Sequence, residues 1–236
     1  MFAANPKVQL VSIPDNPPCV VIDNALADPQ ALVDLAVQHR ASFAEAENNG
    51  FPGLELRMHP DFSAKLSDFF LLHVRRHFDA RRTLSSFSRL SMVSRSPQEL
   101  RPLQRLCHRD YASLDPNQRM FASVLYLFHD PAMGGTSFFR PRQGEDETWE
   151  LRYRWWRMTG EQFTRETGLQ PAYPTESNDY FERVATVDAA WNRVIFYSAG
   201  TYHSGDIRQP ERMVPDPVQG RLTLNGFFVC RPRAGA

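Results

Sequence analysis

The segment His108-Arg109-Asp110 places an imidazole and a carboxylate two positions apart in a chain with seven histidines. In a β-strand, residues i and i+2 point to the same face, so both side chains could converge on one ion. A neutral imidazole together with a carboxylate suits Fe(II), Mn or Zn. Because an HxD pair also arises by chance in many chains, it predicts a metal site only if a third ligand follows in a suitable place.

A third ligand is expected at the end of a later strand, and His203 lies there. It follows the apolar segment 192–198 and a turn of small residues. Three protein ligands leave coordination positions open for a cosubstrate and for dioxygen. We therefore expect His108, Asp110 and His203 to hold one catalytic metal ion.

A cation that would bind an anionic cosubstrate is expected in the same pocket. In the alternating segment 221–230, Arg221 and Thr223 share one face with Asn225, whereas the intervening leucines point to the other face. The planar guanidinium of an arginine can bind a carboxylate through two hydrogen bonds. Arg221 is the first candidate for this role, and Arg212, in the preceding proline-rich loop, is held in reserve.

Taken together, these residues resemble the iron(II)- and 2-oxoglutarate-dependent dioxygenases, and most closely their prolyl-hydroxylase-like branch. The segment "RMFASVLYLFHDPAMGGTSFF" (119–139) adds Arg119, Tyr126 and the Gly134-Gly135 turn to the pattern. The resemblance covers roughly residues 84–140 and 182–230. It implies that Fe(II) is bound by His108, Asp110 and His203, and that 2-oxoglutarate is bound by Arg221 with help from Thr223 and Tyr126.

The resemblance also implies an activity, the hydroxylation of a substrate by O2 with conversion of 2-oxoglutarate to succinate and CO2. The carboxylate of Asp110 favours hydroxylation over halogenation, since halogenases of this family carry a small residue there. Whether the substrate is a small molecule or a peptide is left open, as is the oligomeric state. The candidate substrate contacts are Arg57, near the "FPG" of 51–53, and Trp155 and Trp156 in an insert rich in arginine and aromatic residues.

Other functions are left open by the residues alone. A cupin-like metal protein, or a dioxygenase that does not use 2-oxoglutarate, would need the same metal ligands, and a non-catalytic ligand-binding jelly roll would need the same fold. A structural or partner-binding module would carry the motif by coincidence. A zinc site at His73 and His77 is disfavoured, because Val74 stands where a zinc protease carries its glutamate. Cys107 is expected to be a buried core residue.

The order of elements predicts the fold that positions these residues. Strands are expected at 7–13 and 19–22, followed by a helix with Asp28 as N-cap and Pro29 at its first position, and by a second helix over 61–78. From Thr83 onward, strands dominate, apart from a helical insert. This order predicts a mainly β protein with N-terminal helices (α+β), a double-stranded β-helix (jelly roll, cupin-like) with a helical insert. The expected later strands are 84–95, 121–128, 135–139, 183–188, 192–198 and 221–230.

We expect a single domain over residues 1–236. Residues 1–82 would supply N-terminal strands and supporting helices, residues 83–140 and 182–231 the core of the double-stranded β-helix, and residues 141–181 an insert that could act as a lid. The apolar share of 42% is enough for a substantial core in a chain of 236 residues.

Charge and composition disfavour several other classes. Lys+Arg and Asp+Glu both number 27, so there is no excess of basic residues for nucleic acid. The sequence has no signal peptide and no apolar run that could span a membrane. Its three cysteines lack the spacing of a disulfide framework or a thiolate zinc site, which indicates a reducing compartment. We therefore expect a cytoplasmic protein without nucleic-acid or membrane partners.

Overall fold

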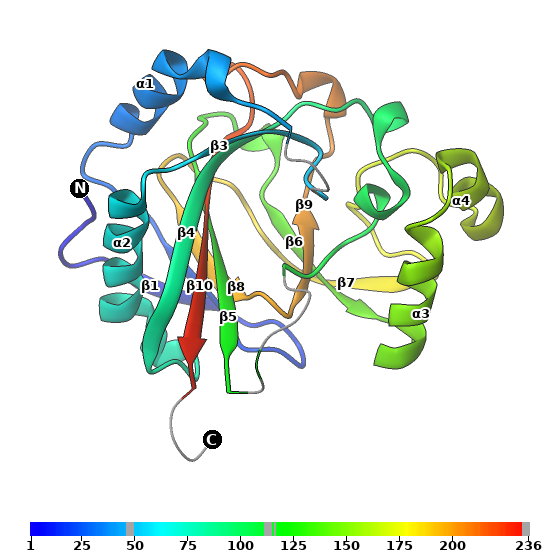
Figure 1. The fold of residues 1–236 in the computed structure, drawn as a ribbon, viewed down its shortest axis with the longest axis horizontal. Coiled ribbons are helices and arrows are strands. Elements are labelled where there is room, and N and C mark those ends of the chain that lie inside the picture. The colour runs from blue at the N-terminus through cyan, green and yellow to red at the C-terminus, as the bar shows by residue number, and fades with distance from the viewer. Residues whose placement is uncertain (46–49, 111–114, 116, 233–236) are drawn as a thin grey trace.

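The computed structural model describes residues 1–45, 50–110, 115 and 117–232, and these residues form two antiparallel sheets (Figure 1). The strands of the large sheet are β1 (Val8–Val11), β2 (Cys19–Ile22), β3 (Gly53–Arg57), β4 (Arg82–Val93), β5 (Arg119–Tyr126), β8 (Val194–Ser198) and β10 (Leu222–Arg231). Those of the small sheet are β6 (Thr136–Pro141), β7 (Phe181–Val187) and β9 (Tyr202–Gly205). The strand orders are β1-β2-β8-β5-β10-β4-β3 and β7-β6-β9. The expected mainly β character with helices is thereby confirmed.

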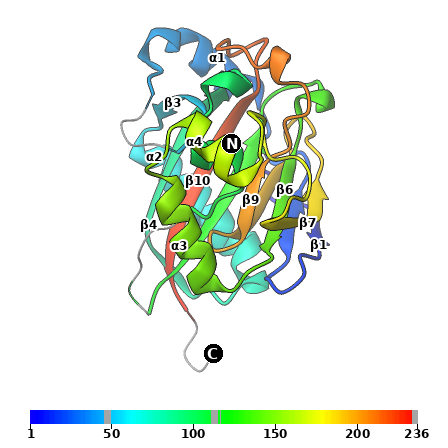
Figure 2. The same ribbon diagram turned by 90° about the vertical axis from the view of Figure 1, so that its right-hand side faces the viewer.

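Two helices cover the outer face of the large sheet, and two others lie beside the small sheet (Figures 1 and 2). The first pair is α1 (Gln30–Gln38) and α2 (Pro60–Phe69), and the second pair, inside the predicted insert, is α3 (Glu145–Trp155) and α4 (Gly160–Thr167). A capping box of Thr159 and Gln162 opens α4. Short turns of 3-10 or π helix occupy Arg40–Ser42, Phe70–Val74, Arg75–His77, Pro97–Glu99, Pro102–Arg105, Pro131–Met133 and Pro210–Arg212.

The alternation of β10 separates two environments. Leu222, Leu224 and Phe228 are buried in an apolar core together with residues of α1 and α2. The opposite face of the strand looks toward the small sheet, where a second apolar core and a cavity lie between the two sheets. The strand therefore holds its polar residues toward the cavity by burying its leucines on the other side.

The insert has a small apolar core of its own. Trp155 and Phe163 pack edge to face, with ring centroids 5.7 Å apart, and both are buried. They join Leu106, Cys107 and Tyr202 in one cluster, which ties α3 and α4 to the segment that carries His108 and to β9. The insert is therefore packed against the elements that carry the predicted metal ligands.

Three expectations about the elements need correction. The segment 48–55 ("NNGFPGLE") is expected as a loop, of which 48–49 lie outside the described residues, but Gly53–Arg57 form β3. The glycines and proline of this segment mask a short alternating strand whose leucines pack on the outer core. The helix expected over 61–78 is regular only to Phe69; a π turn at Phe70–Val74 and a 3-10 turn at Arg75–His77 follow, and Leu72 in the π turn is 73% exposed. The first helix begins at Gln30, after Pro29, and Asp28 Oδ1 accepts a hydrogen bond from the Ala31 amide.

All three cysteines, Cys19, Cys107 and Cys230, are buried and unpaired. Burial raises the pKa of Cys230 to about 11, and it raises the pKa values of Cys19 and Cys107 further. Cys107 is thus the buried core residue that the sequence predicts. Within the described part of the chain, no helix combines the length and apolar character needed to cross a membrane.

Candidate metal centre

His108 and Asp110 are held next to His203 by backbone pairing. The amide of each histidine donates to the carbonyl of the other, with N–O distances of 2.9 Å in both directions, and the Asp110 amide donates to the carbonyl of Ala199. The segment 108–110 thus runs antiparallel to the residues that lead into β9 and extends the small sheet at its β9 edge. Because residues i and i+2 share a face, both predicted ligands of this segment point toward the partner histidine.

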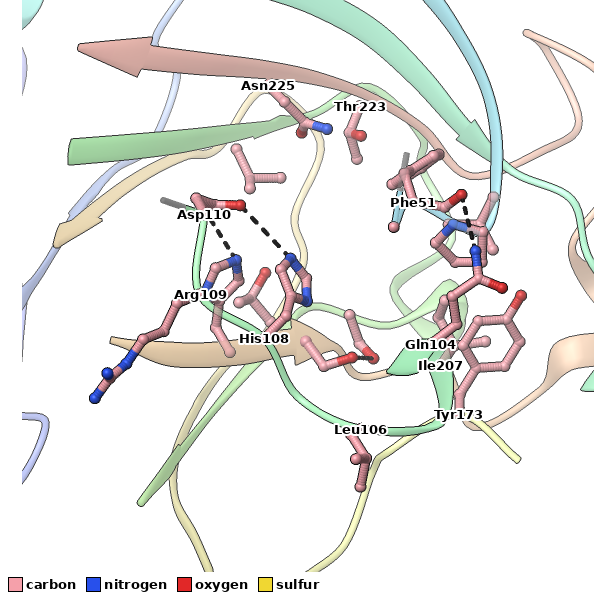
Figure 3. A pocket seen from close by; sticks show the side chains of 18 of the residues that line it. Phe51, Gln104, Leu106, His108, Arg109, Asp110, Tyr173, Ile207, Thr223 and Asn225 are labelled. Carbon is pink, nitrogen blue, oxygen red and sulfur yellow. Dashed lines mark hydrogen bonds and ion pairs between the residues drawn. The ribbon is translucent and has the colours of Figure 1, made fainter. Parts of the chain in front are cut away.

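The three predicted ligands converge on one point (Figure 3). Asp110 Oδ1 lies 3.5 Å from His108 Nε2, and Asp110 Oδ2 lies 3.3 Å from His203 Nε2. Among the described residues, these three side chains are the only group of His, Cys, Asp or Glu whose ligand atoms meet in this way, all within 4.8 Å of one another. His73 and His77 do not form such a group.

Hydrogen bonding leaves the metal-facing atoms available. His203 Nδ1 lies 2.9 Å from the carbonyl of Thr201, which can only accept, so Nδ1 carries the proton and the Nε2 lone pair faces Asp110. Asp110 Oδ2 is buried and accepts no hydrogen bond from the described residues. A buried carboxylate oxygen without a donor is costly unless a cation neutralises it. The donor set therefore fits a borderline divalent metal ion.

Burial sets the protonation of the site. It lowers the pKa of His203 to about 4, with Asp110 acting in the opposite direction, so this imidazole is neutral near pH 7. Burial by itself would raise the pKa of Asp110, but the neighbouring His203, His108 and Arg89 outweigh it, and the pKa is lowered. A neutral imidazole beside an ionised carboxylate is the state in which both groups bind a metal.

The ligands border a cavity of about 470 Å³ between the two sheets. This volume is within the usual range of small-molecule sites, roughly 300–1,000 Å³. Figure 3 shows Thr223 and Asn225 across the cavity from His108, with Phe51 and Tyr173 along its side. Phe87, Val93, Leu103, Leu106 and Phe227 supply further apolar lining.

Arg221 lies in the wall of the same cavity, only 4% exposed. Its Nε is 3.2 Å from the carbonyls of Met133 and Gly134, and its Nη2 donates to the carbonyl of Gly135 at 2.9 Å. No carboxylate of the described chain forms an ion pair with it. Burial lowers the pKa of Arg221 from its very high usual value. The Gly134-Gly135 turn thus positions a buried guanidinium that has no internal anion.

Tyr126 and Thr223 lie beside this guanidinium. Thr223, in β10, lines the cavity and follows Arg221 by two residues; Arg221 directly precedes the strand. The guanidinium carbon of Arg221 is 5.9 Å from the centre of the Tyr126 ring, whose hydroxyl is 2.8 Å from Thr136 Oγ1, and Thr136 lines the cavity. Burial raises the pKa of Tyr126, so its hydroxyl stays protonated.

Four other predicted residues are not brought to the cavity. Trp155 is fully buried in the insert core, where its Nε1 donates to Glu166 Oε1, and Trp156 is 65% exposed. Arg57 stacks on Phe87 with its guanidinium carbon 5.4 Å from the ring centre, so it contacts a lining residue without lining the cavity itself. Arg212 pairs with Asp130 outside the cavity. The two tryptophans that are expected to contact the substrate therefore do not line this cavity.

The sequence did not single out several residues of the cavity wall. Arg89 lines it and pairs with Glu55 at 2.8 Å, and Arg152 reaches it from α3. Tyr173 lines it from the end of the insert, and its hydroxyl donates to the carbonyl of Arg95. Alternation along β4 could have indicated Arg89, because it shares a face with Ser91 and Val93. Nothing in the helical pattern distinguishes Arg152 from the other arginines of α3.

Comparison with known proteins gives a family and a fold. Residues 4–228 match the model of the "Family of unknown function (DUF6445)". No curated protein matches the sequence significantly. The structure is similar to the non-heme alpha ketoglutarate dependent carbocyclase SnoK from nogalamycin biosynthesis, with a TM-score of 0.50 and 14% identity over 94% of this chain and 84% of that one. This likeness shows a shared fold, and it agrees with the resemblance drawn from the sequence.

Two further solved structures are similar at a lower score. One is a prolyl-4-hydroxylase from Pseudomonas putida, with a TM-score of 0.48 and 14% identity over 93% of this chain and 95% of that one. The other is HygX from Streptomyces hygroscopicus with nickel and 2-oxoglutarate bound, with a TM-score of 0.48 and 12% identity over 92% of this chain and 83% of that one.

Proposed function

We propose that this chain, which belongs to the family of unknown function DUF6445, is a non-haem Fe(II)- and 2-oxoglutarate-dependent oxygenase. It would hydroxylate a substrate with formation of succinate and CO2. The observation that carries the proposal is that one cavity contains both a His-Asp-His group and a buried arginine without an internal anion. The first group can hold a metal, and the second can hold the carboxylate of a cosubstrate.

The proposed architecture is a double-stranded β-helix within a single domain over residues 1–236. Its core would consist of residues 83–140 and 182–231, which supply β4, β5, β8 and β10 of the large sheet and nearly all of the small sheet. Two antiparallel sheets with a cavity between them, and the fold shared with SnoK, support this assignment. Residues 1–82 would be the supporting part, and the insert 141–181 would close one side of the cavity.

The metal would be held by His108 Nε2, His203 Nε2 and Asp110. A bound Fe(II) with 2-oxoglutarate supplies the oxidative chemistry, in which O2 is the oxidant. The chain's own part is to keep His203 neutral through burial and to fix its tautomer through the Thr201 carbonyl. Asp110 supplies the negative charge that partly balances the metal.

Arg221 would bind the distal carboxylate of 2-oxoglutarate. Its Nη1 makes no hydrogen bond within the described chain, so the fork keeps donors for an incoming carboxylate, while the carbonyls of residues 133–135 fix its orientation. Thr223 would add a hydroxyl, and Tyr126 would position Thr136 and pack against the guanidinium. Arg212 lies outside the cavity, and we set it aside for this role.

The apolar walls would exclude water from the metal during turnover. Phe87 and Phe227, on strands of the large sheet, stack with ring centroids 4.7 Å apart, and Leu103 and Leu106 line the same cavity. In such an environment, charge interactions are stronger than in water, and a reactive centre is protected from side reactions.

Anaerobic titration of the metal-free protein with Fe(II) and then 2-oxoglutarate tests the proposal. The weak visible charge-transfer band of the iron–2-oxoglutarate chelate is expected to appear and to saturate. A folded protein that binds Fe(II) but gives no band would support the alternative of a metal protein that does not use 2-oxoglutarate. Succinate formation in a substrate screen would then identify the reaction.

A further inference from the structure

Arg152 is a cation at the cavity without a matching anion. It extends from α3 to the cavity wall, and its Nη1 donates to the carbonyl of Cys107 at 2.8 Å, directly before His108. No carboxylate of the described chain forms an ion pair with it, and its remaining donors make no hydrogen bond there. Arg154, two residues further along the same helix, instead pairs with Glu166 at 2.6 Å.

The other charges around the cavity can be matched in pairs. The described lining contains four arginines and one carboxylate. Arg89 is neutralised by Glu55, and Arg109 by Glu145, to which its Nη1 and Nη2 both donate. Under the proposed function, the divalent metal and Arg221 together carry three positive charges, and Asp110 and the two carboxylates of 2-oxoglutarate carry three negative charges. Arg152 is the single charge that remains.

We propose that Arg152 binds a carboxylate group of the substrate, so that the enzyme acts on organic acids. This inference rests on the proposed function for its charge count. One remaining positive charge matches a carboxylate, whereas the dianion of a phosphate monoester would leave an excess negative charge. The planar guanidinium also offers the parallel hydrogen bonds that a carboxylate accepts.

The rest of the wall indicates what the acid carries. Besides Arg152, the lining contains the stacked rings of Phe87 and Phe227 and the apolar side chains Leu103, Leu106 and Phe51. Across the cavity, Asn225 Oδ1 is buried and accepts no hydrogen bond from the described residues, while its Nδ2 donates to Ser91. The fitting substrate class is therefore a carboxylic acid with an apolar body and a hydrogen-bond donor that reaches Asn225.

Binding can be measured without turnover. The protein is loaded with Zn(II), which has no redox chemistry, and with 2-oxoglutarate, so that Arg221 is occupied. Calorimetric titrations then compare phenylacetate and octanoate with phenylacetamide and octanamide, and with phenyl phosphate. Wild type is expected to prefer each carboxylate over its amide by about 10- to 100-fold, the range for a charge-assisted hydrogen-bonded pair.

The Arg152→Gln variant is expected to lose this preference, and Arg154→Gln to keep it. Retained zinc and 2-oxoglutarate affinity and an unchanged melting temperature show that Arg152→Gln is folded, and Arg152→Lys should recover part of the preference. The inference is overturned if no carboxylate binds wild type better than its amide, if Arg152→Gln keeps the preference, or if phenyl phosphate binds better than both acids. Failure of 2-oxoglutarate to bind the zinc protein would instead count against the proposed function, and is seen in a separate titration.

Discussion

His108 and His203 exchange two backbone hydrogen bonds with N–O distances of 2.9 Å, and the centroids of their imidazole rings are 4.5 Å apart. The two residues belong to segments that are distant in the sequence, so the metal site depends on the pairing of these segments at the edge of the small sheet. Because the pairing is formed by backbone atoms, substitution of one ligand side chain should remove metal binding without removing the fold.

Asp110→Asn is expected to weaken Fe(II) or Zn(II) binding at least roughly 100-fold, since the loss of an outer partner of a ligand already costs about 10- to 100-fold. The amide keeps the shape of the side chain but loses the charge that balances the metal. Titration in competition with a chelator measures the affinity. Asp179→Asn, at an exposed position, is the matched control and should bind as wild type does. Equal affinities in the two variants would contradict the ligand assignment.

Arg221→Gln is expected to lower the affinity for 2-oxoglutarate by about 10- to 100-fold, with metal affinity retained. The reason is the loss of a buried cation of the cavity wall that forms no ion pair with a carboxylate of the described residues. Arg212→Gln should leave the affinity unchanged, because Arg212 pairs with Asp130 outside the cavity. The chelate band in an anaerobic titration reports both variants. The opposite result would assign the cosubstrate carboxylate to Arg212.

The metal-free protein should lose stability as the pH falls from about 6.5 to about 4. Burial lowers the pKa of His203 to about 4 in the folded state, so the unfolded chain takes up this proton first. The stabilisation that comes from neutral His203 is fully present above the unfolded-state pKa of about 6.5. It is lost as the pH falls toward the folded-state pKa of about 4, and it amounts to at most about 3 kcal/mol of unfolding free energy. The lowered pKa of Asp110 acts in the same direction at more acidic pH.

Denaturant unfolding between about pH 6.5 and pH 4 measures the loss of stability, and the His203→Gln variant is compared with wild type. The variant lacks the titrating imidazole, so its unfolding free energy should fall less steeply with decreasing pH than that of wild type. Parallel pH profiles for the two proteins would show that His203 is not held in its neutral form by burial.

Gly134→Ala is expected to destabilise the protein by about 2–4 kcal/mol. Gly134 has a φ of 87°, and a Cβ there would lie 2.0 Å from the carbonyl oxygen of Asp206. The turn must therefore shift, and with it the carbonyls that orient Arg221, so 2-oxoglutarate affinity should fall as well. Gly144→Ala is the control, because a Cβ at Gly144 meets nothing within 4 Å. Similar unfolding free energies for both variants would refute the packing argument.

Trp155→Ala is expected to cost about 3–5 kcal/mol of stability, because the ring is buried in the insert core against Phe163 and Tyr180. Trp156→Ala should change stability by less than about 0.5 kcal/mol, since its ring is exposed. Thermal or denaturant unfolding distinguishes the two. A large loss for Trp156→Ala would mean that this side chain has a contact that the structure does not give it.

The sequence predicted what depends on local pattern. Alternation in 221–230 placed Arg221 and Thr223 on one face, and the structure puts that face in the cavity wall. The HxD spacing required one shared face for His108 and Asp110, and the structure brings both to His203. The most specific prediction combined the HxD pair, the later histidine and the Arg-x-Thr pair, because each motif alone is common and their combination in this order is rare.

What the sequence could not supply depends on long-range packing. Trp155 and Trp156 are the same residue type at adjacent positions. Their side chains point about 100° apart around the helix, and only the docking of α3 decides which ring is buried. Likewise, only the docking of α3 decides that Arg152 reaches the cavity while Arg154 pairs with Glu166. The π turn after Phe69 shifts the helical register, and no local signal marked it.

The burial of all three cysteines has a practical consequence for labelling. Maleimide reagents should find no native thiol on the folded protein, so a cysteine introduced by Trp149→Cys on α3 and another by Leu72→Cys, both at exposed positions, can be labelled selectively. A donor and an acceptor fluorophore at these two positions would report, through energy transfer, whether the insert changes its distance from the rest of the molecule when an organic acid enters.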